Sequence, residues 1–384
     1  MSRFLMFTLF LIAVMLQGGA YGLTFMLPRL FDGFGADEKT VGAMLMITTV
    51  ATLLSVYFSG HLSDRVGALS LACISIAAAL VFFGVASSVG AMLVIASMLL
   101  GWGWGITYAL GPVVLTRLVT ADERVRYFAL NSVFLMAGFG LSPVMASKIE
   151  AAGGTVSDAS YITAGLCLIS AALFFLLIRP VRAHSVNPGP EATSRLSIGV
   201  VGGIFRSTAR IPVIMVFLAA SVFAGMNNLQ TVFADDRGLN YADFFLYYTI
   251  TVVIFRIALA RFKGGSNPYL TIAVLQYIMA GSVLLFLYLG SNQALYVLFA
   301  VLFGIGYGAS YPILAAMAAK DADEALVPQT LQLFALTYFI GIFGFPLVAG
   351  WLIVDVGTGA LLVLVIAMAA IEATMAVFRA RGVA

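Results

Sequence analysis

The sequence predicts an all-α membrane protein with twelve transmembrane helices in two six-helix bundles that repeat in parallel. Three observations support this fold class. Hydrophobic residues make up 62% of the 384 residues and charged residues only 10%, whereas soluble domains carry about 25% charge. Apolar runs long enough to cross a bilayer follow one another along the chain. A glycine-rich pattern in the first half returns in the second half at a constant spacing.

A transmembrane helix needs about 20 mostly apolar residues. Windows of that size predict spans at 4–27, 41–60, 68–87, 91–115, 127–147, 161–178, 211–233, 243–261, 269–289, 293–317, 327–350 and 358–378. The polar segment 179–210 is interpreted as a linker between an N-terminal bundle, 1–178, and a C-terminal bundle, 211–384. The first apolar run follows Arg3 and can also be read as a signal peptide, but its length favours a retained helix.

The positive charges predict which ends of the spans face the cytoplasm. One set of loops contains Arg29, Lys39, Lys148 and Arg237, and Arg256 lies inside a span. The other 15 of the 20 Lys and Arg residues lie in the opposite loops, the linker and the termini. The positive-inside rule therefore places both termini and the linker in the cytoplasm of a multi-pass protein of the inner membrane.

The residues that carry metal, redox and nucleophilic chemistry are sparse. Cys73 and Cys167 sit inside apolar runs, and the two histidines, His61 and His184, fall in polar loops. This pattern predicts no disulfide framework, no metal site and no cofactor. Because the chain also lacks a nucleophile–base pair and a phosphate loop, we predict no catalytic residues, no enzymatic activity and no nucleic-acid partner.

Two motifs repeat at an offset of 203 residues. The stretch GWGWGITY at 101–108 matches GIGYGASY at 304–311, so that three glycines and the closing tyrosine correspond. In the fifth and eleventh spans Gly138 corresponds to Gly341, and Pro143 to Pro346. Spans 4 and 5 therefore repeat as spans 10 and 11, in the same order and orientation. Internal repeats of this kind recur in transporters, with the substrate site at the repeat interface.

The loop between spans 2 and 3 reads GHLSDRVG and supplies Gly60, Asp64, Arg65 and Gly67. It resembles the loop motif G-x-L-x-D-R-x-G of the major facilitator superfamily, although Ala68 and Leu69 replace the basic residues that follow. The resemblance covers nearly the whole chain and implies alternating access. It also implies a cytoplasmic gate, in which Asp64 meets the N-terminal end of span 11; a solvated loop pair is the alternative.

Span 5 resembles the antiporter motif G-x-x-x-G-P-x-x-G-G, with Ser142 and Ala146 at two glycine positions. This resemblance favours the drug and metabolite efflux branch. Pro143 and Pro346 are predicted to bend spans 5 and 11 during transport, and static kinks are the alternative.

Aromatic and amide side chains in the spans are the candidate substrate-binding residues. The glycines of both repeats are predicted to pack helices together, which leaves the aromatic face of each span free. Single amides can instead form hydrogen bonds between helices. The candidates are Gln17, Tyr21, Trp104, Tyr108, Asn131, Asn227, Asn228, Tyr307, Tyr311 and Gln332, with Thr24, Gln230 and Gln329 nearby.

Charged residues inside the spans are scarce. Arg256 can extend to the cytoplasmic surface. Glu372 is the only carboxylate inside a span and the candidate for proton coupling, although it can instead pair with a basic side chain. The resemblance gives protons as the coupling ion.

The predicted function is secondary active transport of a small organic molecule, neutral or weakly charged, by a monomer in the lipid bilayer. Export is the first prediction, and uptake of a sugar-like metabolite is the alternative. A membrane enzyme and a non-transporting receptor or scaffold are the alternatives from other classes. Concentration-dependent flux in proteoliposomes distinguishes a transporter from a scaffold.

Overall fold

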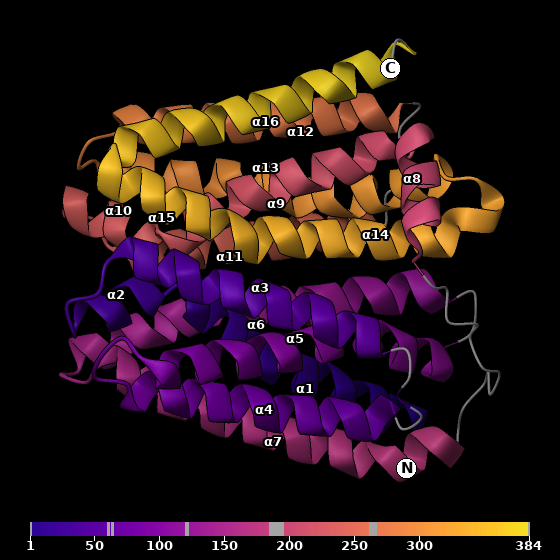
Figure 1. Cartoon of the computed structure of the whole chain (residues 1–384), viewed down its shortest axis with the longest axis horizontal. Helices are drawn as coiled ribbons and strands as arrows, with labels where there is room; N and C mark the ends of the chain where they lie inside the picture. Colours follow the sequence, from indigo (N-terminus) through magenta and orange to yellow (C-terminus); the bar gives the residue numbers. More distant parts are fainter. Residues whose placement is uncertain are drawn as a thin grey trace. The chain divides into compact units, whose positions relative to one another are not determined.

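The computed structural model describes residues 2–59, 62, 65–119, 123–183, 196–260 and 267–382. All regular secondary structure in this part of the chain is helical, and twelve helical segments are long and apolar enough to cross a membrane. The chain divides into two compact units, Met1–Glu191 and Ala192–Ala384, coloured indigo to magenta and magenta to yellow in Figure 1. The prediction of an all-α chain with twelve spans is confirmed.

The first unit packs its long helices in a fixed set of pairs. It contains α1 (Arg3–Thr24), α2 (Leu27–Asp32), α3 (Glu38–Ser59), α4 (Arg65–Val85), α5 (Ala91–Leu118), α6 (Arg124–Ala151) and α7 (Val156–Ala183). Helix α1 packs against α6 and α7, α5 packs against α3 and α4, and α4 packs against α7.

The second unit repeats these pairs. It contains α8 (Ile198–Arg206), α9 (Arg210–Asn228), α10 (Gln230–Arg237), α11 (Tyr241–Ala260), α12 (Pro268–Tyr288), α13 (Gln293–Lys320), α14 (Val327–Phe339), α15 (Phe345–Asp355) and α16 (Thr358–Ala380). Helix α9 packs against α14, α15 and α16, α13 packs against α11 and α12, and α12 packs against α16. The 203-residue offset therefore relates equivalent helices with equivalent neighbours.

The first span of each unit is shorter than the sequence predicts. Helix α1 ends at Thr24, and the short helix α2 follows with Pro28 in its first turn. Helix α9 ends at Asn228, and α10 begins at Gln230. The predicted spans 4–27 and 211–233 each join a long helix to the start of a short one. Part of the predicted linker 179–210 is helical as well, because α7 continues to Ala183 and α8 lies within it.

The repeated glycines lie where helices approach most closely. A Cβ added at Gly103 of α5 would lie 2.5 Å from the carbonyl oxygen of Ala72 in α4. Its equivalent in α13, Gly306, would place a Cβ 2.8 Å from the carbonyl oxygen of Leu275 in α12. Gly101 and Gly105 face α3 in the same way, where Thr52 donates a hydrogen bond of 3.1 Å to the Gly101 carbonyl.

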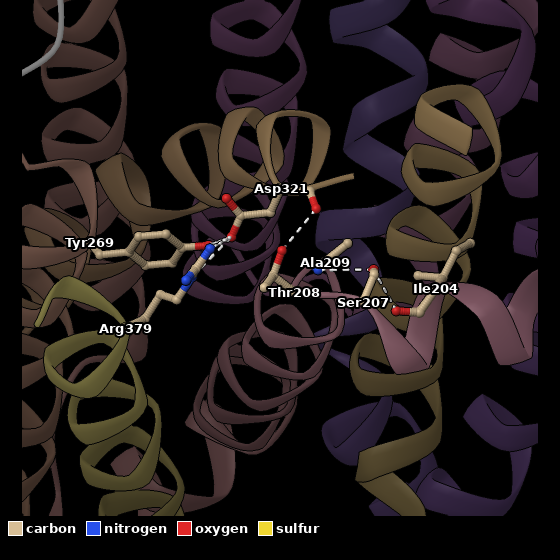
Figure 2. A network of polar contacts seen from close by, with 7 residues as sticks. All are labelled: Ile204, Ser207, Thr208, Ala209, Tyr269, Asp321 and Arg379. Atoms are coloured by element: carbon tan, nitrogen blue, oxygen red, sulfur yellow. Dashed lines mark hydrogen bonds and ion pairs between the residues drawn. The ribbon is translucent and has the colours of Figure 1, made fainter. Parts of the chain in front are cut away.

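A network of polar contacts joins four helix ends of the second unit (Figure 2). The carboxylate of Asp321, just after α13, accepts hydrogen bonds from Tyr269 Oη at 2.5 Å and from Arg379 Nε at 3.2 Å. The Asp321 carbonyl oxygen accepts a hydrogen bond of 3.1 Å from Thr208 Oγ1. The Ser207 hydroxyl, just before Thr208, donates a hydrogen bond of 2.8 Å to the Ile204 carbonyl near the end of α8. The starts of α9 and α12 are thereby tied to the ends of α13 and α16.

Candidate functional site

An aromatic cluster in the first unit contains two of the predicted substrate residues. Tyr21 of α1 and Trp104 of α5 stack with ring centroids 5.0 Å apart and an interplanar angle of 22°. Phe139 of α6 lies 4.3 Å from the Tyr21 ring and 5.5 Å from the Trp104 ring. Tyr21 and Trp104 are both buried. The close approach of α1 and α6 that brings these rings together depends on Gly22, which packs directly on the backbone of Phe139.

Polar side chains lie on the same three helices as this cluster. Gln17, one helical turn before Tyr21, is 4% exposed, and its Oε1 has no hydrogen-bond partner among the described residues. Asn131 of α6 is half-buried, and its Oδ1 is likewise without a partner in the described part of the chain. Tyr108, one turn after Trp104, is half-buried and so is more accessible than Trp104.

A second aromatic cluster occupies the equivalent place in the second unit. Tyr307 of α13 stacks on Phe223 of α9 at a centroid distance of 4.3 Å and an angle of 21°. The Tyr307 hydroxyl lies 3.1 Å from the hydroxyl of Tyr338 in α14. The ring of Tyr311, which is half-buried, lies 4.9 Å from the Tyr338 ring. Trp104 and Tyr307 correspond in the repeat, so each unit stacks the same position of its fourth span on an aromatic ring of its first span.

The structure adds three residues that the sequence analysis missed: Phe139, Phe223 and Tyr338. Phe139 lies in the GFGLSP stretch already singled out, where a ring between two glycines was a usable signal. Phe223 lies one turn before Asn227. Tyr338 carries no motif, and only the crossing of α13 and α14 brings its hydroxyl to Tyr307.

The amides at the end of α9 form hydrogen bonds within their own helix. Asn227 Nδ2 donates to the Phe223 carbonyl at 2.9 Å, and Asn228 Nδ2 donates to the Ala224 carbonyl at 3.1 Å. Gln230 instead joins two helices, because its Nε2 donates to Tyr296 Oη of α13 at 2.7 Å. The amide oxygens of all three residues are buried without a hydrogen-bond partner among the described residues.

The remaining predicted amides lie on α14. Gln332 is half-buried, and within the described ranges its Oε1 has no hydrogen-bond partner. Gln329, less than one turn earlier, shows the same pattern. On α1, Thr24 donates to the Tyr21 carbonyl at 2.7 Å, so its hydroxyl is used within the helix.

Arg256 does not extend to the surface. Its side chain is 6% exposed, and Nε points to the Gly308 carbonyl of α13 at 3.4 Å. The interpretation of a side chain that reaches the cytoplasmic surface is therefore wrong, because close packing of α11 on α13 at Gly308 holds the guanidinium inside the unit.

Two of the predicted gating residues, Gly60 and Asp64, lie outside the described residues. Arg65 begins α4, and Gly67 lies in its first turn. The proline-containing spans differ: α6 continues through Pro143, whereas a π-helical segment, Ile340–Gly344, precedes Pro346. A π segment interrupts the regular hydrogen-bond pattern of an α-helix, so span 11 has a break that span 5 does not show.

The two residues of α6 that replace glycines of the antiporter motif, Ser142 and Ala146, both fit into buried positions. The Ser142 hydroxyl donates a hydrogen bond of 2.6 Å to the Gly19 carbonyl of α1. Ala146 is fully buried. Gly138 packs on the α1 backbone, and a Cβ added at its equivalent, Gly341, would lie 2.9 Å from the Phe217 carbonyl oxygen of α9. Small side chains thus hold the first and fifth spans of each unit together.

The residues that could bind a metal or react as nucleophiles are dispersed in the described part of the chain. It contains no group of three or more His, Cys, Asp or Glu residues that could hold a metal ion. Cys73 and Cys167 are buried, and the sulfur of Cys73 lies 3.4 Å from Ser170 Oγ. Glu372 lies fully buried in α16.

Twelve candidate spans in two units with matching helix pairs define a multi-pass membrane protein. The family model described as Major Facilitator Superfamily matches residues 9–346, and the chain belongs to this family.

Two further comparisons agree with this assignment. Human protein spinster homolog 1 is 26% identical over 177 residues, which cover 44% of this chain and 34% of that protein. The match thus spans about a third of that relative's length. The crystal structure of the human organic anion transporter MFSD10 (TETRAN) aligns with a TM-score of 0.71 at 14% identity, covering 98% of this chain and 100% of that chain. This likeness shows a shared fold.

Proposed function

We propose that the protein exports a small organic molecule by alternating access, as a proton-coupled antiporter and a monomer. The observation that carries this proposal is the pair of aromatic stacks, Tyr21 on Trp104 and Phe223 on Tyr307, which join the first span to the fourth span in each unit. Half-buried Tyr108 and Tyr311 lie one turn beyond the stacks. Such rings offer flat apolar area and a hydroxyl for orientation.

Uptake of a sugar-like metabolite is the second candidate. The buried amide oxygens of Asn227, Asn228 and Gln230 lack hydrogen-bond partners in the described part of the chain. Leaving a buried acceptor unpaired costs about 1–3 kcal/mol. A substrate rich in hydroxyl groups would remove this cost by donating hydrogen bonds, whereas an apolar substrate would not.

Purified protein provides the test. A thermal-shift screen against metabolites and drugs should identify ligands, because a ligand at 100 times its Kd stabilises the folded state by about 2.7 kcal/mol. A ligand found in this way should then show saturable flux in proteoliposomes, faster in the export direction. Binding without flux would support a receptor, and flux only in the uptake direction would support the second candidate. In the same assay, Asp64→Asn should slow transport at normal expression if Asp64 belongs to a gate.

The proposed orientation, with both termini in the cytoplasm of the inner membrane, can be tested by cysteine labelling. Ser197 precedes α8 in the linker, Ser291 lies between α12 and α13, and both are exposed. A membrane-impermeant thiol reagent should label Ser291→Cys in intact cells and Ser197→Cys only after the membrane is opened. The unsubstituted chain is the control, because its buried Cys73 and Cys167 should not react. Labelling of both sites from the same side would contradict the orientation.

A further inference from the structure

Glu372 in α16 is a buried acid without a hydrogen-bond partner among the described residues. Its side chain is 0% exposed, and neither carboxyl oxygen forms a hydrogen bond with any described residue. An ionised carboxylate is very costly to bury without a compensating charge or hydrogen bond. Glu372 therefore needs a ligand or a nearby side chain that the fold can bring to it.

Gln276 in α12 has the same unusual property. It is 0% exposed, and both its Nε2 and its Oε1 lack hydrogen-bond partners in the described ranges. The amide lies next to Leu275 and three residues before Met279, which pack on Gly306 of α13. Two buried polar side chains, with four unused polar atoms between them, thus lie in helices that pack directly against each other.

Three contacts fix how α12 and α16 lie alongside each other. Asn267 Nδ2 donates to the Ala380 carbonyl at 3.2 Å, the Arg379 guanidinium lies 5.7 Å from the centre of the Tyr269 ring, and the hydroxyls of Tyr277 and Thr374 are 3.2 Å apart. The helices are therefore antiparallel.

This alignment places the two side chains at the same depth. Asn267 and Ala380 are in contact and mark one end of the helix pair. Gln276 follows Asn267 by nine residues in α12, and Glu372 precedes Ala380 by eight residues in α16. At 1.5 Å per residue, both lie about 13 Å from the same end of the helix pair.

The other charged and titratable side chains on α16 and on the helices packed against it either have partners other than Glu372 or lie at helix ends. Arg379, on the same helix, is in an ion pair of 3.1 Å with Asp321. Tyr277 is hydrogen-bonded to Thr374, and Tyr269 donates to Asp321. The other ionisable side chains on the helices packed against α16 lie at helix ends: Tyr288 of α12, Arg210 of α9 and Asp355 of α15.

We propose that Glu372 and Gln276 form a proton-binding site between α16 and α12. A protonated carboxylic acid and a primary amide can pair through two reciprocal hydrogen bonds. The acid hydroxyl donates to Gln276 Oε1, and Gln276 Nε2 donates to the acid carbonyl oxygen. The carboxylate takes one proton from water and later returns it, and no electrons move. Rotation of the two long side chains closes this pair.

This site deepens the proposed function, on which it rests, because it gives the antiporter a place to hold its coupling proton. Loss of the proton leaves a carboxylate that retains one amide donor and lacks a second partner. The protonated and deprotonated forms therefore favour different arrangements of α12 and α16. A transporter needs such a difference, since an ion can shift a conformational equilibrium only through different affinities for the two states.

Infrared difference spectroscopy of the purified full chain in lipid bilayers tests the site without any transported substrate. Changing the pH should produce carboxylic-acid C=O bands from several acids of the wild-type protein, and the Glu372 band is the one that Glu372→Gln removes. Gln276→Met, which keeps the length of the side chain, should move the band to the higher frequency of an acid without a hydrogen-bond partner. Gln276→Asn, which keeps the amide, is the second variant if the methionine variant does not fold, and its shortened amide should also displace the band.

Glu324→Gln is the matched control, because Glu324 is exposed in the connection between α13 and α14 and its loss should leave the Glu372 band unchanged. Identical carboxylic-acid bands in the wild type and in Glu372→Gln, or a Glu372 band that does not move in any Gln276 variant that folds, would overturn the proposal. Since the measurement needs no flux, an intact proton site in a protein that transports nothing would refute the proposed transport instead.

Discussion

Alanine at Tyr108 or at Tyr311 should weaken substrate binding by about 2 kcal/mol, which is about thirtyfold in Kd. Both side chains are half-buried and lie one turn beyond a buried aromatic stack, so each can offer a ring face to a ligand. Phenylalanine at the same positions keeps the ring and removes only the hydroxyl. The expected loss is then about 1 kcal/mol, or about fivefold, if the substrate accepts a hydrogen bond.

Trp102 provides a matched control within the same stretch of sequence. It is 42% exposed, and its ring lies 6.4 Å from that of Phe58 of α3, in a groove that Leu71 of α4 also lines. Trp102→Ala removes a larger side chain than Tyr108→Ala, yet it should leave affinity and transport rate unchanged. Wild-type affinity and rate for both alanine variants, at normal membrane expression, would make Tyr108 and Tyr311 ordinary packing residues.

The number of spans could be predicted because burial in lipid demands long apolar runs. The breaks inside them were less visible. Helix α1 stops at Thr24 although the sequence stays apolar through Leu27, and the signal was Pro28, since proline favours the first turn of a new helix, where its missing N–H leaves no hydrogen bond unmade. The equivalent break after Asn228 has no proline. Only the repeat could have revealed it, because the helices that follow the two breaks begin 203 residues apart, at Leu27 and at Gln230.

The sequence could indicate single residues of the candidate site but not which side chains contact one another. The repeat identified Trp104 and Tyr307 as equivalent, whereas their stacking partners, Tyr21 and Phe223, are not related by the same offset. The sequence does not indicate a role for Gln276, because a single amide in an apolar span is common. Its interest arises from the packing of α12 on α16, which places it level with Glu372.

The glycines of GWGWGITY lead to the second strong prediction, which concerns stability. A Cβ at Gly105 of α5 would lie 2.7 Å from the Thr52 carbonyl oxygen and would overlap Ser55 Oγ. Backbone atoms of α3 cannot move aside cheaply, so Gly105→Ala should destabilise the protein by about 1–3 kcal/mol, the usual cost of overpacking. Gly111 lies in the same helix with nothing within 4 Å of an added Cβ. Gly111→Ala should therefore cost less than Gly105→Ala, because the preference of alanine over glycine in a helix offsets the crowding of its Cβ by Pro112.

The repeat provides a glycine for which alanine should have an intermediate effect on stability. Gly308 is the equivalent of Gly105, but a Cβ there would lie 3.1 Å from Val252 Cα and Cγ2, a tighter contact than usual and yet looser than at Gly105. Thermal unfolding of the purified variants should therefore rank Gly105→Ala lowest, Gly308→Ala next and Gly111→Ala highest of the three. Equal melting temperatures for Gly105→Ala and Gly111→Ala would mean that α5 can move away from α3 at little cost. The ordered result would instead mean that the glycines hold each fourth span against its own unit, so that Tyr108 and Tyr311 on the same helices keep fixed positions for a substrate.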